Sequence, residues 1–387
     1  MSANATSSTW LTTDLNEQSL YFSSQNVQFR AELGDQSLRH RAPVSTAVVN
    51  NLFKQAHQAN IKEPILFGLI PFNALEPASF TIPAVYQRAA VPETAPQSSA
   101  GQQRPTILRQ QPVPEPERYA DAVRAALDLY AAGRVSKIVL ARAMDVFLEG
   151  RVNYQAVLED LIRRNRQGYN FSLPIWNQTL EHQGNMLAAS PELLVRRKGT
   201  SIFVNPLAGS IGRHDDPIID QQRHDGLAVS EKDLREHAYV VEDIVRILKP
   251  FCRALDVPDG PSVIGTDALW HLSTYITGEL HSDDTTALEL SCALHPTPAI
   301  CGHPTPTAFE HILALEEFDR DYFAGLAGWQ NKKGDGEWAL TLRCAWHDLS
   351  ENKLRLYAGA GTVAGSDPDS ETLETATKME TFKRAIT

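Results

Sequence analysis

The arrangement of strand-like runs along the chain is the feature that most limits the folds it can adopt. Runs rich in β-branched and aromatic residues recur between turns, and they occupy residues 136–147, 169–176, 200–204, 337–346 and 353–357. Regular alternation of strand and helix is absent, and no GxGxxG follows a strand. The pattern disfavours a doubly wound nucleotide-binding domain and predicts a large mixed-sheet architecture.

Three long helical patterns are inserted among these runs, at residues 115–132, 230–249 and about 369–386. The middle one begins at Ser230, a residue suited to cap a helix, and Asp233 follows three residues later. Pro250 ends it.

The chain has 387 residues, enough for one large domain or two ordinary ones. Residues 87–116 hold six prolines and six glutamines and almost nothing apolar, so we expect an exposed linker there. This divides the chain into a smaller N-terminal region (1–86), the linker (87–116) and one long region (117–387).

Composition excludes several classes of protein. Acidic residues outnumber basic ones by 47 to 36, and the formal charge of −11 argues against a general nucleic-acid binder. The four cysteines form no CxxC pair, which is typical of reduced thiols in the cytoplasm. Residues 1–17 lack the apolar core of a secretory signal, and no stretch approaches the 18 apolar residues of a membrane span. We therefore expect a soluble cytoplasmic protein.

In the run 337–346, the residues Trp338, Leu340, Leu342, Cys344 and Trp346 alternate onto one face, which we expect to be buried. Arg343 lies on the other face among small residues, with room to bind a planar carboxylate. A surface ion pair is the competing explanation for this arginine.

The last strand ends in Gly359 and Gly361, which either form a tight turn or let the backbone approach a ligand. In the helix that follows, Glu371, Glu374 and Lys378 share one face. This trio is either a solvated stripe or part of a site.

Two further helical acids, Asp233 and Glu236, lie beside the apolar face of the helix at 230–249. Carboxylates from two helices that converge are suitable Mg²⁺ ligands, although acids on surface helices are common. Lys137 and Glu192 each enter an apolar strand-like run. Burial suits the lysine to act as a base, and raises the pKa of a carboxyl as a general acid requires. A lysine that reaches to water and an acid that starts a strand are the structural alternatives.

His271 and His295 are single histidines in apolar settings, which are more often structural than catalytic. Neither GxSxG nor HExxH occurs. The residues alone therefore define a cytoplasmic protein with scattered candidate groups and no specific reaction.

Eight segments in order resemble the chorismate-utilising enzymes, which include isochorismate, salicylate, anthranilate and aminodeoxychorismate synthases. They are SKIVLARA, GNMLAASPELLV, NPLAGSIGR, SEKDLREHAYVVEDI, LHPTPAICGHP, EWALTLRCA, LYAGAGTV and ETLETATK. The resemblance covers residues from about 115 to the C-terminus. Residues 68–83, GLIPFNALEPASFTIP, also resemble the isochorismate synthases of catechol siderophore pathways.

The resemblance implies an α+β domain with antiparallel sheets packed against helices around a central cleft, in which 1–86 is the N-terminal part and 117–387 the chorismate-binding catalytic region. It also implies a Mg²⁺ ion that holds a chorismate carboxylate. Its ligands map onto Glu236 and Glu374, with Asp233 and Glu371 orienting water around the metal. It further implies Lys137 as the base that activates water and Glu192 as the acid that protonates the departing C4 hydroxyl. The implied substrate-binding positions are Ala208, Gly209, His271, Arg343, Gly359, Gly361 and Lys378.

Ala208 stands where aminodeoxychorismate synthases often carry a nucleophilic lysine, so the resemblance disfavours a covalent route. The segment GSIGRHDD differs from the run found in many relatives, which affects the mouth of the cleft near Arg213. The resemblance favours a monomeric, Mg²⁺-dependent isochorismate synthase without a glutamine amidotransferase partner. A salicylate synthase, a menaquinone-pathway isochorismate synthase and a non-catalytic chorismate-binding scaffold are the alternatives.

Overall fold

A computed structural model describes residues 15–92, 96, 104–266 and 269–386. Its largest sheet has ten strands, and each registered pair is antiparallel. In spatial order the strands are β18 (Gly302–His303), β8 (Lys137–Glu149), β22 (Lys353–Thr362), β21 (Cys344–Asp348), β10 (His182–Ser190), β9 (Tyr169–Trp176), β1 (Ser19–Ser23), β2 (Gln28–Glu32) and β6 (Gln87–Ala89), and β7 (Thr106–Val113) pairs with β8.

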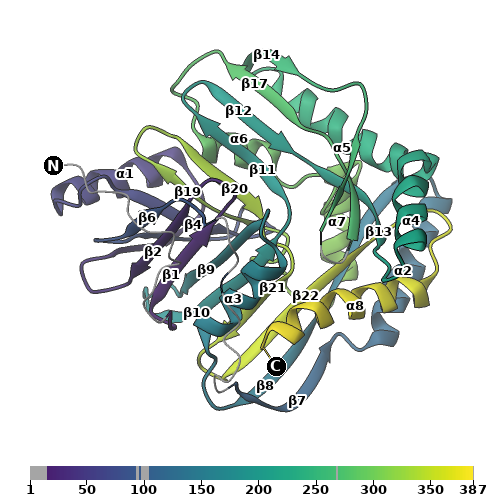
Figure 1. Cartoon of the computed structure of the whole chain (residues 1–387), viewed down its shortest axis with the longest axis horizontal. Coiled ribbons are helices and arrows are strands. Elements are labelled where there is room, and N and C mark those ends of the chain that lie inside the picture. The colour runs from purple at the N-terminus through teal and green to yellow at the C-terminus, as the bar shows by residue number, and fades with distance from the viewer. Residues whose placement is uncertain (1–14, 93–95, 97–103, 267–268, 387) are drawn as a thin grey trace.

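A second sheet of nine antiparallel strands lies against part of the first (Figure 1). Its order is β14 (Cys252–Asp256), β17 (Ile276–Leu280), β12 (Ser201–Asn205), β11 (Leu193–Lys198), β20 (Gly336–Leu340), β19 (Leu326–Asn331), β4 (Ile65–Ile70), β5 (Ala78–Ile82) and β3 (Leu38–Ala42). A small third sheet contains β13 (Leu207–Gly212), β16 (Leu269–Ser273) and β15 (Ser262–Gly265).

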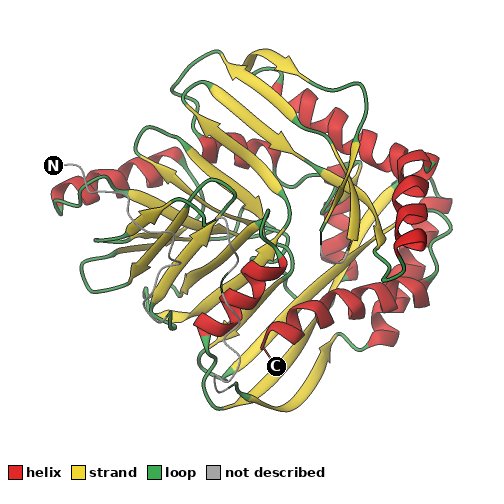
Figure 2. Cartoon of the chain, in the orientation of Figure 1, coloured by secondary structure: helices red, strands yellow, loops and turns green. Residues whose placement is uncertain are grey.

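Helices gather mainly at the end of the molecule away from the N-terminal strands (Figure 2). They are α1 (Thr46–Gln58), α2 (Pro116–Ala131), α3 (Tyr154–Arg164), α4 (Pro217–Val229), α5 (Glu231–Leu248), α6 (Ala287–Leu294), α7 (Thr305–Leu315) and α8 (Pro368–Ile386). The predicted helices at 115–132, 230–249 and 369–386 are confirmed as α2, α5 and α8. The predicted cap is also confirmed, because the Ser230 side chain accepts a hydrogen bond from the Asp233 amide.

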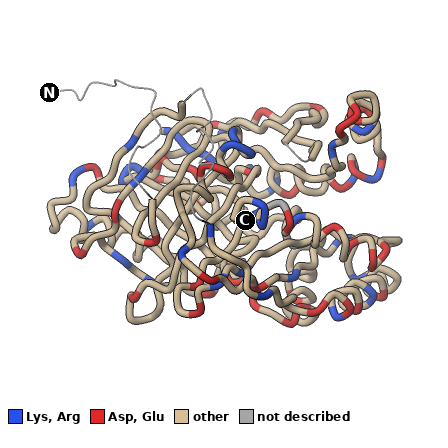
Figure 3. The backbone as a smooth tube through the Cα atoms, turned by 60° about the horizontal axis from the view of Figure 1, so that its bottom comes forward, with Lys and Arg blue, Asp and Glu red and all other residues tan. Residues whose placement is uncertain are grey.

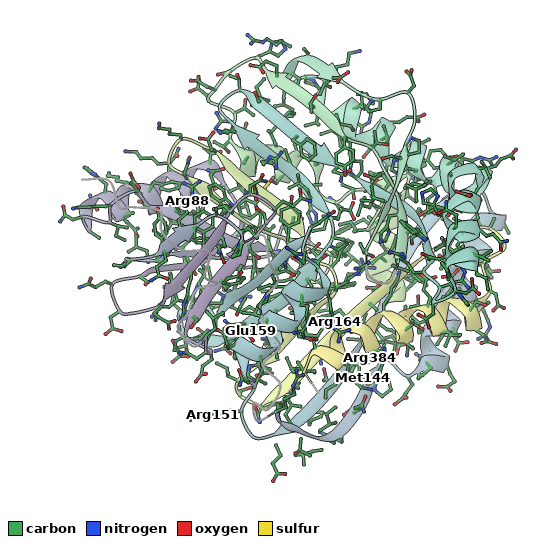
Figure 4. The ribbon with its side chains drawn as sticks, in the orientation of Figure 1. Arg88, Met144, Arg151, Glu159, Arg164 and Arg384 are labelled. Atoms are coloured by element: carbon green, nitrogen blue, oxygen red, sulfur yellow. The ribbon has the colours of Figure 1, made fainter. Side chains whose placement is uncertain are left out.

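Two hydrophobic clusters hold these layers together. The larger one lies between the two large sheets and includes Trp176, Trp338 and Phe171, all fully buried. The smaller one joins α3 and α8 to the outer face of the ten-stranded sheet. Met144 packs against it from β8, whereas Arg164 and Arg384 are exposed (Figure 4). The α+β class with large sheets packed by helices is therefore confirmed.

The structure differs from the expected linker at 87–116. Residues 87–89 form β6 on the edge of the ten-stranded sheet, and residues 106–113 form β7, which pairs with the far half of β8. Most of β7 is exposed, because an edge strand needs only one hydrogen-bonded neighbour and can present polar side chains to water. Residues 93–95 and 97–103 of this segment, and most of the N-terminal stretch 1–17, lie outside the described residues.

Acidic and basic positions are intermixed along the described chain (Figure 3). Among the described residues, no helix is long and apolar enough to cross a membrane.

Replacing Trp338 tests the larger core. Its side chain has no exposed surface, so Trp338→Ala leaves a cavity between the two large sheets. We expect a loss of about 3–5 kcal/mol in the free energy of unfolding, measured by urea denaturation. The control Leu75→Ala removes a side chain that is 84% exposed and should leave the transition unchanged. Equal shifts in both variants would contradict this account of the core.

Candidate active site

The candidate residues line one cavity of about 500 Å³. This volume is in the range of small-molecule pockets, about 300–1,000 Å³. Every site residue expected from the sequence lines it: Lys137, Glu192, Ala208, Gly209, Asp233, Glu236, His271, Arg343, Gly359, Gly361, Glu371, Glu374 and Lys378. They come from β8, β13, β16, β22, α5, α8 and the connections next to β11 and β21.

Lys137 opens β8 and is buried, with 4% of its side chain exposed. Its Nζ donates a hydrogen bond of 2.7 Å to Oε1 of Glu236 on α5. Burial alone would raise the pKa of Glu236, but the ammonium of Lys137 holds it below its usual value. The lysine therefore faces the cavity, and the surface alternative is excluded.

Glu192 lies between β10 and β11 and is 6% exposed. Its Oε1 accepts a 3.3 Å hydrogen bond from the Leu207 amide. Burial raises the pKa of Glu192 to about 8, although that hydrogen bond and the charge of Lys137 oppose the rise. The expected upward shift is confirmed, and it gives the cavity a carboxylic acid that is protonated at neutral pH.

The chain around Arg343 corrects one expectation. The predicted strand 337–346 is two strands, β20 and β21, separated by residues 341–343. Arg343 has a left-handed backbone, with φ of 47°, so strict alternation does not continue through it. Trp338, Leu340 and Cys344 are buried as predicted, but Leu342 lines the cavity.

Arg343 lies beside His271 of β16, and 3.3 Å separates its Nη2 from the His271 Nε2. Burial, together with the charges of Arg343 and Lys378, lowers the pKa of His271 to about 3. The imidazole is therefore neutral, and its Nε2 can accept the hydrogen bond from the guanidinium. This arrangement turns the arginine toward the cavity.

Gly359 and Gly361 do not form a turn. Both lie inside β22, where they pair with Ala141 and Val139 of β8. A Cβ atom at position 361 would approach the Cε of Lys137 to 3.3 Å, so the glycine leaves room for the lysine side chain. The carbonyl oxygen of Gly359 accepts a 2.8 Å hydrogen bond from the Nζ of Lys378.

Carboxylates of α5 and α8 line the same side of the site. Glu374 is paired with Lys378 at 2.7 Å and keeps about half of its side chain exposed. Burial raises the pKa of Glu371, and the nearby negative charge of Glu374 adds to the rise. The Asp233 carboxylate accepts a hydrogen bond from the hydroxyl of Ser230 at the start of α5. In the described ranges, no group of three or more His, Cys, Asp or Glu is arranged to hold a metal by itself.

Several lining residues had no assigned role at the start, among them Lys232, Ile300, Arg320, Phe323 and Tyr357. The sequence could have indicated Lys232 as a site residue, because it directly precedes Asp233 on the helix that carries the candidate acids. No local sequence pattern marks Arg320 as a site residue, since it contacts Val139 of β8, which is far away in the sequence. Arg213, at the cavity mouth, is bound by Asp220 and stacks over Trp270.

This fold and this site define a class of protein. The sequence model of the family described as "Chorismate binding enzyme" matches residues 73–387, and the chain therefore belongs to that family.

Its relatives include isochorismate synthases. Isochorismate synthase DhbC of Bacillus subtilis is 44% identical over 334 residues, which cover 86% of this chain and 83% of DhbC. Isochorismate synthase EntC of Escherichia coli K12 is 39% identical over 86% of this chain and 83% of EntC. The crystal structure of DhbC from Bacillus anthracis matches with a TM-score of 0.88 and 40% identity, covering 96% of this chain and 97% of that one.

The raised pKa of Glu192 predicts a dependence of stability on pH. Between its ordinary pKa of 4.5 and about 8, only the folded chain keeps the proton, so rising pH lowers stability across this window. Glu192→Gln removes this loss. We expect its free energy of unfolding to increase relative to wild type as pH rises from about 4.5 to about 8, measured by urea denaturation. The exposed Glu289→Gln is the control; a pH-independent difference for Glu192→Gln would refute the shift.

Proposed function

We propose that this protein is an isochorismate synthase, which adds water at C2 of chorismate while the C4 hydroxyl leaves. One observation carries the proposal: a buried lysine and a buried, protonated glutamic acid line the same cavity. Such a pair supplies the base and the acid that the reaction needs. The similarity to DhbC and EntC supports the same activity.

The two groups have opposite roles in this proposal. The Nζ of Lys137, once its ammonium proton has been released, takes a proton from the water whose oxygen bonds to C2. The electrons of the two ring double bonds shift toward C4, and the C4–O bond breaks. Glu192 gives its proton to the departing hydroxyl, which leaves as water. One water enters and one leaves, so the product is an isomer of the substrate.

The cationic side chains Arg343 and Lys378 would hold the substrate carboxylates. Arg343 is turned toward the cavity by neutral His271, and Lys378 is anchored between Glu374 and the Gly359 carbonyl. Gly361 leaves space beside Lys137, and the backbone at Ala208 and Gly209 would border the ring. Holding both ends of the substrate fixes C2 and C4 relative to base and acid.

The carboxylates on α5 and α8 fit a Mg²⁺ ion. Glu236 and Glu374 come from different helices and line one cavity, and each is paired with a lysine through one oxygen. Mg²⁺ is commonly bound by one or two carboxylates together with water and substrate oxygens. We propose Glu236 and Glu374 as ligands, with Asp233 and Glu371 orienting bound water. Mg²⁺ would supply positive charge for a chorismate carboxylate.

We further propose that the isochorismate serves a 2,3-dihydroxybenzoate or catechol siderophore pathway. The resemblance of residues 68–83 to siderophore-type enzymes supports this choice. Similarity to the vibriobactin-specific isochorismate synthase of Vibrio cholerae, 38% over 86% of this chain, also supports it. In this proposal the enzyme acts in the cytoplasm as a monomer, without a glutamine amidotransferase.

The direct test is incubation of purified protein with chorismate, with and without Mg²⁺, followed by chromatography with mass detection. We expect isochorismate to form with the metal and to disappear when a chelator is added. Salicylate and pyruvate would instead identify a salicylate synthase. Unchanged chorismate in the presence of Mg²⁺ would refute the proposed activity and favour a binding scaffold.

Lys137→Ala tests the base. Loss of a positioned general base costs about 10²–10⁴-fold in rate, so turnover should fall by that factor. Chorismate binding, measured by calorimetry, should remain detectable because Arg343 and Lys378 are intact. Lys198→Ala, which removes an exposed lysine at the end of β11, is the matched control. Turnover equal to wild type in Lys137→Ala would eliminate this residue as the base.

A further inference from the structure

The edge of β8 has a gap next to the active site. On one side β8 pairs with β22 along its length, from Ile138 to Phe147. On the other side β18 covers only Lys137 and Ile138, and β7 begins its pairing at Ala143. The Val139 amide still donates to the Cys301 carbonyl at 2.8 Å, but the Val139 carbonyl and the Ala141 amide face no strand on that edge. These residues directly follow the proposed base, Lys137.

A buried ion pair fills this gap. Glu316, the C-cap of α7, accepts a 2.7 Å hydrogen bond from the Ala141 amide through its Oε1. Arg320 donates a 2.6 Å hydrogen bond from Nη2 to the carbonyl oxygen of Val139, and Nη1 donates to the carbonyl of Ile300 at 3.2 Å. The two side chains are joined by the Arg320 Nε, 2.7 Å from Glu316 Oε2.

The pair is almost completely removed from water, with 3% of the Arg320 side chain and 4% of the Glu316 side chain exposed. Arg320 also stacks over the ring of Phe72, with its guanidinium carbon 4.2 Å from the ring centre. A buried ion pair adds little net stability compared with apolar side chains of similar size. What apolar side chains could not supply here is partners for buried backbone groups, which must be hydrogen-bonded.

We propose that Glu316 and Arg320 are positioning residues, which replace the missing strand and fix the start of β8 so that Lys137 reaches its catalytic place. Arg320 lines the same cavity as Lys137, and the pair holds the backbone two and four residues beyond it. The pair also ties β8 to Ile300, which lines the cavity from another segment. The effect on catalysis rests on the proposed function, whereas the effect on the backbone does not.

The test uses the double variant Glu316→Leu/Arg320→Met, because removing only one partner would leave a buried charge and endanger folding. We expect the double variant to fold but to lose stability, because the Ala141 amide and the Val139 and Ile300 carbonyls lose buried hydrogen-bond partners. Hydrogen exchange at the Ala141 amide, measured by mass spectrometry on peptides covering residues 137–143, should become faster. Because misplacement by about 1 Å can cost about 100-fold, kcat should fall by about that factor, with KM for chorismate little changed.

A second buried pair on the same strand provides the matched control. Asp145 of β8 binds Arg355 of β22 through hydrogen bonds of 2.7 and 2.8 Å, in the half of β8 that already has β7 as a neighbour. Asp145→Leu/Arg355→Met should leave kcat and the exchange at Ala141 unchanged.

Further variants separate a backbone role from a charge role. Glu316→Gln/Arg320→Met keeps an oxygen for the Ala141 amide without leaving a buried charge, and it should retain more of kcat and of the exchange protection than Glu316→Leu/Arg320→Met. Slow exchange at Ala141 in the double variant would overturn the structural part of the proposal. Fast exchange with wild-type kcat would overturn the positioning role. If wild-type protein forms no isochorismate, the proposed function fails, and the exchange result still decides whether the pair holds β8.

Discussion

The antiparallel pairing of β8 with β22 is the constraint on which the rest of the site depends. Ten residue pairs join the two strands, from Lys353 opposite Phe147 to Thr362 opposite Ile138. The N-terminal end of β8 carries Lys137, and the C-terminal end of β22 leads directly into α8. Because antiparallel strands bring opposite ends together, this one ladder places the lysine beside the helix that bears Glu374 and Lys378. A shift of register would separate these groups.

Electrostatics then give similar side chains different properties within one cavity. Glu236 faces an ammonium group, and the pKa of this carboxyl is held low despite burial. Glu192 accepts a backbone hydrogen bond from Leu207 and is affected less by the charge of the same lysine, so burial dominates and raises its pKa. His271 lies near two cations and is neutral. The site therefore contains a charged carboxylate, a protonated carboxyl and an uncharged imidazole, each set by its neighbours.

Part of the fold and of the site could be predicted from the sequence, chiefly where apolar residues recur at a regular spacing. The helices α2, α5 and α8 were marked by apolar spacing and by a cap, which are local properties. Burial of Glu192 was predictable because it enters an apolar run. The break at residues 341–343 was not, since no glycine or proline marks it and Arg343, with its left-handed backbone, is bonded to Ala189 and His271, which are distant in the sequence. The structure around Gly359 and Gly361 was also ambiguous. Two nearby glycines are found in tight turns, but also in strands that must leave space for a neighbouring side chain.

Arg320 shows most clearly why local sequence patterns do not reveal all the residues that meet at a site. It lies beyond α7, more than 180 residues from Val139, and its sequence neighbours indicate only an ordinary charged loop. Its importance arises because two short neighbours, β18 and β7, stop before they meet along β8. A strand in that gap would satisfy the same backbone groups but would occupy the wall of the cavity with a continuous ladder. Two side chains satisfy them from a distance instead, so the edge next to Lys137 stays both fixed and open to the cavity.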